Sequence, residues 1–239
     1  MVVLAVFRRT QAGNSAWLDF SYWEILGLIG TAYLSACILY VPFHRRRWAP
    51  LLFLIALCTL NVITAAGGLK FLRLLPRIIW PFGNGALVSI VMAGILASQI
   101  FLEESLAKTL RYRVLLALGY ASALGAAGTL LIPLGISKVR ATPTWCLYTS
   151  AMSILIFLAL YWIADIKRLS RWAFFVKPAG SNTLLTYLLP DIFYALLGSY
   201  WFTAQASQPW HGALRSAVFT AFILLWAAGM TRLKVKLLL

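Results

Sequence analysis

Seven long apolar segments separated by short basic links constrain this chain more than any other feature. The segments cover residues 23–43, 50–68, 85–102, 114–134, 146–164, 179–200 and 214–230. A helix of about 20 residues crosses a hydrocarbon core of about 30 Å. We therefore predict an all-α fold, a polytopic transmembrane helical bundle of about seven spans.

The overall composition agrees with a membrane protein. Hydrophobic residues make up 62% of the 239 residues and charged residues 11%, whereas a soluble domain has about 45–50% apolar and about 25% charged residues. No stretch is long enough for a separate water-soluble core. We expect one transmembrane domain over residues 23–239, preceded by an N-terminal stump, residues 1–22, outside the membrane.

The net charge of +15 comes from 21 Lys and Arg residues distributed in small groups between the apolar segments. This distribution fits topology determinants and argues against nucleic-acid binding. If the links alternate between the two sides of the membrane, 13 of these cations lie on the side of the C-terminus and 8 on the opposite side. The predicted location is the inner (plasma) membrane, with the lipid bilayer as partner and a cytoplasmic C-terminus.

Two further features refine the expected bundle. Residues 70–83 carry Lys and Arg at three- and four-residue spacing, typical of an amphipathic helix in the interface. Gly119, Gly125 and Gly128 indicate that the fourth span lies inside the bundle, because small residues let helices approach closely. Isolated cysteines and two distant histidines predict no metal site.

Polar residues inside the fifth and sixth spans mark the region in which a function should lie. Asp165 closes the fifth span, and the sixth contains Asn182, Tyr187 and Asp191. Asp191 follows Pro190, which frees a backbone carbonyl, and both a functional and a hydrogen-bonded structural role fit it. Asn182 could equally cap the start of its helix.

Four motifs together resemble one family of membrane enzymes. They are WEILGLIGTAYL at 23–34, GISKVRATPTW at 135–145, YWIADI at 161–166 and GSNTLLTYLLPDIF at 180–193. In this order they are similar to the heparan-alpha-glucosaminide N-acetyltransferase family, above all its bacterial branch. The resemblance implies transfer of an acetyl group from acetyl-CoA, across a membrane, to a sugar amine as acceptor.

The resemblance covers the C-terminal part of such an enzyme. The family's N-terminal helices, which carry an implicated histidine, have no counterpart here, so we expect a missing upstream part or N-terminal partner; a homo-oligomer is an alternative. By position, Lys138, Asp165, Asn182 and Tyr187 match the family pattern. Where relatives show a His-Glu pair in the sixth helix, this chain has Pro190-Asp191.

Acyl transfer needs a base, a donor to the oxyanion and cations for the phosphates of the coenzyme. We assign catalytic roles to Asp191 and His211, and binding of acetyl-CoA to Lys138, Arg140, Asn182 and Tyr187. His211 could also be an ordinary loop histidine, His44 fits an interface anchor, and Lys138 and Arg140 could contact lipid headgroups instead.

Two functional hypotheses follow from the sequence. The first is an acetyl-CoA-dependent acyltransferase, or a part of one, with a polar cavity in the membrane. The alternative is a non-catalytic membrane protein, either permease-like or a truncated remnant. Whether the chain alone is an enzyme is left open, because the histidine-bearing helices have no counterpart.

Overall fold

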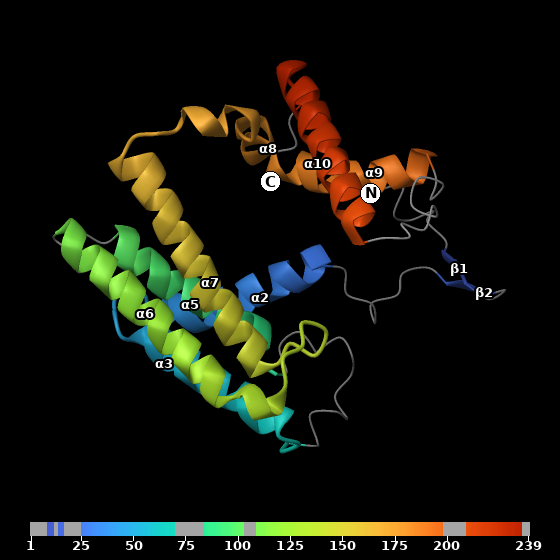
Figure 1. The fold of residues 1–239 in the computed structure, drawn as a ribbon. Helices are drawn as coiled ribbons and strands as arrows, with labels where there is room; N and C mark the ends of the chain where they lie inside the picture. Colours follow the sequence, from blue (N-terminus) through green and yellow to red (C-terminus); the bar gives the residue numbers. More distant parts are fainter. Residues whose placement is uncertain are drawn as a thin grey trace. The chain divides into compact units, whose positions relative to one another are not determined.

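The computed structural model describes residues 9–11, 14–16, 25–69, 84–102, 109–197 and 209–235. Apart from one short hairpin, the described elements are helices (Figure 1). The elements are β1 (Arg9–Gln11), β2 (Asn14–Ala16), α2 (Ile25–Tyr40), η1 (Val41–Phe43), α3 (Ala49–Ala65), α5 (Ala86–Leu102), α6 (Leu110–Leu130), η4 (Ile132–Leu134), α7 (Pro143–Tyr161), η5 (Trp162–Ile166), η6 (Arg171–Phe175), α8 (Lys177–Ser181), α9 (Thr183–Leu197) and α10 (Pro209–Arg232). The predicted helical fold class is confirmed.

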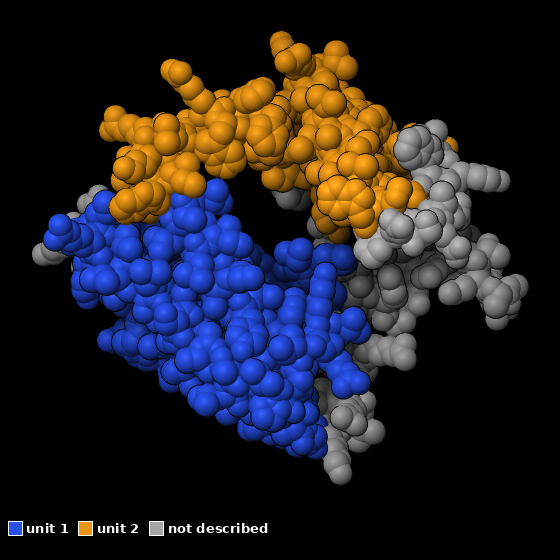
Figure 2. All heavy atoms as spheres, in the orientation of Figure 1, with its two compact units in different colours: residues 1–160 blue, residues 161–239 orange. Residues whose placement is uncertain are grey.

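Two compact units make up the chain, residues 1–160 and residues 161–239, and Figure 2 colours them separately. The division falls at the end of α7, where the helix continues into the π-helical turn η5, which contains Asp165. The single transmembrane domain over residues 23–239 stays a prediction.

In the first unit α5 packs against α2, α3 and α6. Its inner face buries Val88, Met92 and Ala93. At the start of α5, Gly85 has φ +68°, and a Cβ atom there would lie 3.0 Å from the carbonyl oxygen of Leu57 in α3. Glycine therefore meets two needs at this position, a left-handed backbone and a close approach between helices.

In the second unit α9 and α10 pack through a core of four buried residues. Leu185 and Leu189 lie one helical turn apart on α9, and Ile223 and Ala227 lie one turn apart on α10. Residues four apart share one helix face, so this spacing alone gives each helix its contact stripe. Phe219, Trp226 and Met230 cover the edges of the cluster.

Three of the described helices are long and apolar enough to cross a membrane. They are Leu110–Leu130, Pro143–Ile166 and Trp210–Arg232. Four other apolar helices are shorter, Gly27–Phe43, Ala49–Ala65, Ala86–Leu102 and Thr183–Leu196. A helix of 17 residues, such as α3, rises about 25 Å, less than a hydrocarbon core of about 30 Å. Seven apolar helices therefore coincide with the seven predicted segments, but spanning by all seven stays a prediction.

The boundaries of the last two segments differ from those predicted. The sixth segment is divided into α8 and α9 at Asn182, whose backbone leaves the helical region with φ −139° and ψ 56°. The seventh helix begins at Pro209, earlier than the predicted Leu214, since proline suits the first turn of a helix. His211 therefore lies in a helix and not in a loop, which corrects the sequence interpretation.

The glycines of α6 also behave differently from the prediction. A Cβ atom at Gly119 or Gly125 would meet nothing within 4 Å, and only Gly128 approaches α7, where Tyr148 ring carbons would lie 3.3 Å away. Of the three glycines, only Gly128 therefore makes a close helix approach in the described structure; the position of this span inside the bundle stays a prediction. The predicted amphipathic helix at 70–83 lies outside the described residues, and the strands β1 and β2 pair within the predicted N-terminal stump.

Candidate functional sites

The polar loop between α6 and α7 has a defined conformation. The hydroxyl of Thr142 accepts a hydrogen bond from the Ser137 amide (3.0 Å), and the Thr142 amide donates to the Ser137 carbonyl (3.1 Å). From α3, the buried amide of Asn61 donates to the carbonyl of Ala141 (3.1 Å), a residue with φ +48°. The Asn61 side chain, which belongs to a helix 80 residues earlier in the sequence, thus holds the loop in place.

Lys138 and Arg140 project from this loop. Both side chains are exposed, while the residues that follow them, Ala141 to Thr144, are buried. The Arg140 amide donates to the Ser137 hydroxyl (3.2 Å), which fixes the backbone between the two cations. The loop therefore presents two positive charges on an ordered backbone, an arrangement suited to an anionic group.

Asn182 is buried at the junction of α8 and α9, only 2% exposed. Its amide nitrogen donates to the carbonyl of Val235 (2.8 Å) and lies 3.4 Å from the Thr231 hydroxyl. These groups follow or end α10, where backbone carbonyls lack partners within the helix. The observed bonds give Asn182 a structural role that joins α9 to α10; its predicted role in cofactor binding stays a prediction.

Changing Asn182 to alanine is expected to lower the free energy of unfolding by about 1–2 kcal/mol, because the Val235 carbonyl loses a buried donor. Thermal unfolding of the detergent-purified chain measures this loss. Ser181→Ala is the matched control, since that exposed hydroxyl donates only to the local Pro178 carbonyl. Unchanged stability together with weaker acetyl-CoA binding would instead indicate the ligand role.

Tyr187 and Asp191 lie on the exposed face of α9, whereas Asn182 is buried just before the helix begins. The buried face carries Leu185, Leu189 and Phe193, whereas Tyr187 and Asp191 are exposed. That Asn182, Tyr187 and Asp191 act together in binding and catalysis stays a prediction.

A cavity of about 390 Å³ between α9 and α10 is lined by His211, whose side chain is exposed. Arg215, four residues further along α10, lies on the same wall, and Phe193 of α9 with Phe219 and Phe222 of α10 supplies aromatic surface. Phe193 meets Phe219 and Phe222 edge to face, with ring centroids 5.2 and 5.6 Å apart. An imidazole and a guanidinium thus share one largely apolar hollow.

Sequence reasoning missed Arg215 as a site residue and counted it only as a topology determinant. The available signal was its four-residue spacing from His211, which places both side chains on one face once 209–213 is helical. Lys138 and Arg140 belong to the first unit, whereas Asn182, Tyr187, Asp191 and His211 belong to the second. The described residues hold no cluster of three or more His, Cys, Asp or Glu for a metal ion.

The fold and the sites together define this chain as a helical protein with three helices long enough to cross a membrane. It also has an ordered basic loop and an apolar cavity that His211 and Arg215 line. Comparison with known proteins adds no relative, because no family model, curated protein or solved structure matches the chain.

Proposed function

We propose that this chain is a seven-span protein of the bacterial inner (plasma) membrane, with a cytoplasmic C-terminus, that transfers the acetyl group of acetyl-CoA to a sugar amine. The observation that carries the proposal is the cavity in which His211 lies on one wall with Arg215. The four motifs that resemble the N-acetyltransferase family support it independently.

In the proposed reaction the amine nitrogen attacks the thioester carbonyl carbon. His211 accepts the proton that the nitrogen loses, the carbon–sulfur bond breaks, and the coenzyme leaves as a thiol after protonation. Arg215 stabilises the negative charge that develops on the carbonyl oxygen.

Lys138 and Arg140 are proposed to bind an anionic part of a substrate, with the phosphates of acetyl-CoA as the first candidate. By the predicted topology, the loop that carries them lies outside the cytoplasm. The same side would hold the acceptor in a transmembrane transfer, so an anionic acceptor is the second candidate.

The test is acetyl transfer by the full chain in sealed vesicles, with acetyl-CoA and glucosamine as probes. Formation of N-acetylglucosamine and free coenzyme A supports the proposal. Absence of turnover and of saturable acetyl-CoA binding by a folded, monodisperse sample would overturn it. Uptake of glucosamine into vesicles without acetyl-CoA would identify the permease-like alternative.

Lys138→Ala and Arg140→Ala are each expected to weaken acetyl-CoA binding about 10-fold or more, because a charge-assisted hydrogen bond contributes about 1.5–3 kcal/mol. Calorimetry on the detergent-purified protein measures this affinity. The control is Arg232→Ala, which removes an exposed cation at the end of α10. Unchanged affinity for acetyl-CoA with a raised KM for the acceptor would assign the loop to the acceptor.

A further inference from the structure

Residues 167–177 of the second unit, here called the basic aromatic segment, combine cations with exposed apolar side chains. Nine of these 11 residues are exposed. The segment begins where the helix Pro143–Ile166 ends, and this helix is long and apolar enough to cross a membrane. Residues that directly follow a spanning helix lie at the level of the lipid headgroups. The segment is therefore placed to meet the membrane surface.

The backbone of the basic aromatic segment is ordered. Arg168 has a left-handed backbone with φ +54°, and the Leu169 amide donates to the Ile163 carbonyl (3.0 Å), which closes the preceding helix. The Ala173 amide then donates to the Ser170 carbonyl (3.0 Å) at the start of η6. η6 contacts α8, and α8 packs against α9 and α10. The segment is therefore a built part of the second unit.

Four large apolar side chains of the segment are exposed: Leu169, Trp172, Phe174 and Phe175. Phe174 is 77% exposed, and its ring meets that of Phe175 edge to face, with centroids 5.9 Å apart. Contact with water is unfavourable for such side chains, whereas aromatic residues are favoured at the boundary between headgroups and hydrocarbon. A soluble polyanion offers no apolar phase, so a bilayer surface fits these side chains better.

The same segment carries four cations and no acid. The cations are Lys167, Arg168, Arg171 and Lys177. The whole chain has six acids for 21 Lys and Arg residues, so its own carboxylates cannot neutralise most of its cations. An anionic bilayer surface attracts each Lys or Arg that lies close to it. The charge of the segment therefore selects a phospholipid with a negative headgroup over a zwitterionic one.

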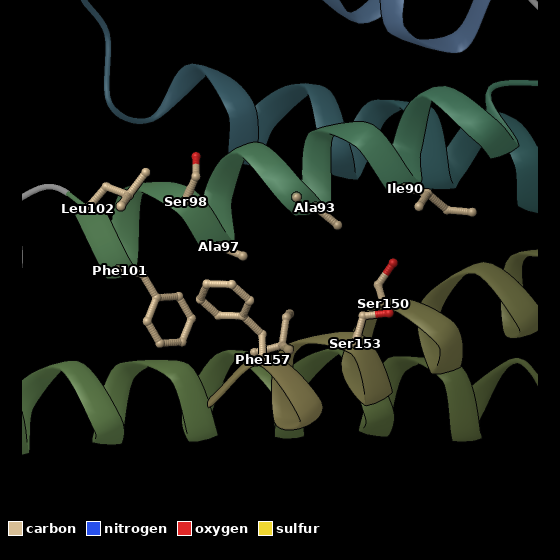
Figure 3. A pocket seen from close by; sticks show the side chains of 11 residues that line it. Ile90, Ala93, Ala97, Ser98, Phe101, Leu102, Ser150, Ser153 and Phe157 are labelled. Atoms are coloured by element: carbon tan, nitrogen blue, oxygen red, sulfur yellow. The ribbon is translucent and has the colours of Figure 1, made fainter. Parts of the chain in front are cut away.

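The groove between α5 and α7 provides an uncharged reference surface within the first unit (Figure 3). It has a volume of about 480 Å³, and no charged side chain is among the described residues that line it. Phe157 lines this groove and is 51% exposed, the same fraction as Phe175. An apolar surface without charge has no means of distinguishing one headgroup from another.

We propose that the basic aromatic segment binds anionic phospholipid at the membrane surface. The Phe174 and Phe175 rings enter the upper part of the hydrocarbon, beside the lipid. Arg171 donates hydrogen bonds to the phosphate oxygens, and Lys177 adds a second positive charge. The proposal does not depend on acetyl transfer, because none of these residues belongs to the proposed reaction site.

The test is fluorine NMR on the full chain in phosphatidylethanolamine vesicles, with Phe174 replaced by trifluoromethylphenylalanine. A trace of phosphatidylglycerol or phosphatidylcholine carries a nitroxide at the headgroup end of one acyl chain and broadens the fluorine signal wherever it lies close. The anionic probe is expected to broaden the signal at least about 5-fold more than the zwitterionic probe, the factor for about 1 kcal/mol per cation. The same label in place of Phe157, about 14 Å before the end of the helix Pro143–Ile166, should be broadened equally by both probes.

Arg171→Gln combined with Lys177→Gln should remove most of the preference for the anionic probe at position 174. The matched pair Lys138→Gln with Arg140→Gln, also two exposed cations, should leave it unchanged. A preference that survives the first pair would overturn the assignment of Arg171 and Lys177.

Two results with the native charges in place would overturn the proposal itself, even where the double variant fails to fold. The first is equal broadening of the signal at position 174 by the two lipid probes. The second is stronger broadening by a paramagnetic chelate in the water than by either lipid, which would assign the segment to a soluble polyanion or an acidic protein.

Discussion

Changing His211 to glutamine is expected to lower the turnover number for acetyl transfer by about 10²–10⁴-fold, the range that a general base contributes. Glutamine keeps the approximate size and a polar end but cannot accept and release the proton. Binding of acetyl-CoA should persist, because the cations proposed to hold it lie in the loop at 135–142. Turnover in vesicles and calorimetry on the same preparation separate the two effects.

The chain provides its own control for this prediction. It has two histidines, and the second, His44, is exposed and lies 2.8 Å through Nδ1 from the Val41 carbonyl in the same turn. His44→Gln should therefore leave turnover unchanged. Equal activity of the two variants, whether both normal or both reduced, would remove His211 from the proposed mechanism.

Changing Leu189 to alanine is expected to lower the free energy of unfolding by about 2–5 kcal/mol, the range for buried leucine in packed cores. Leu189 is 1% exposed and lies between Leu185 and the α10 residues Ile223 and Ala227. A cavity there removes contacts from both helices at once. Reversible unfolding in mixed detergent, followed by circular dichroism, measures the change.

Leu225→Ala makes the same chemical change at a position that is 74% exposed. Lipid tails are as apolar as leucine, so the lost side-chain contacts are replaced by lipid or detergent and stability should change little. A loss at Leu225 as large as that at Leu189 would show that α9 and α10 do not pack as described.

The positions of the helices could be predicted from the sequence because each coincides with an apolar run bounded by polar or basic residues. The break at Asn182 could not, since a single asparagine fits a helix start, a binding site or a helix junction equally well. Its partners, Thr231 and Val235, lie about 50 residues further along the chain. No local pattern indicates a contact over such a separation.

The candidate site was predictable only in part, for a similar reason. His211 was singled out by its chemistry, but its placement beside Arg215 required a helix that begins at Pro209. Asp191 and Tyr187 were grouped with Asn182 by closeness in the sequence, while the structure exposes the first two and buries Asn182.

By itself the sequence determined that this protein is helical and apolar, and where its helices lie, because burial in hydrocarbon requires each segment to satisfy its own backbone hydrogen bonds. It also determined the chemical groups available, two histidines and a few polar residues within apolar segments. The tertiary structure decided which of them meet: Asn61 with the basic loop, Asn182 with the end of α10, and His211 with Arg215 and an aromatic wall. The physical reason is that helix formation is local, whereas side-chain contacts depend on the rotation and distance between helices from distant parts of the chain.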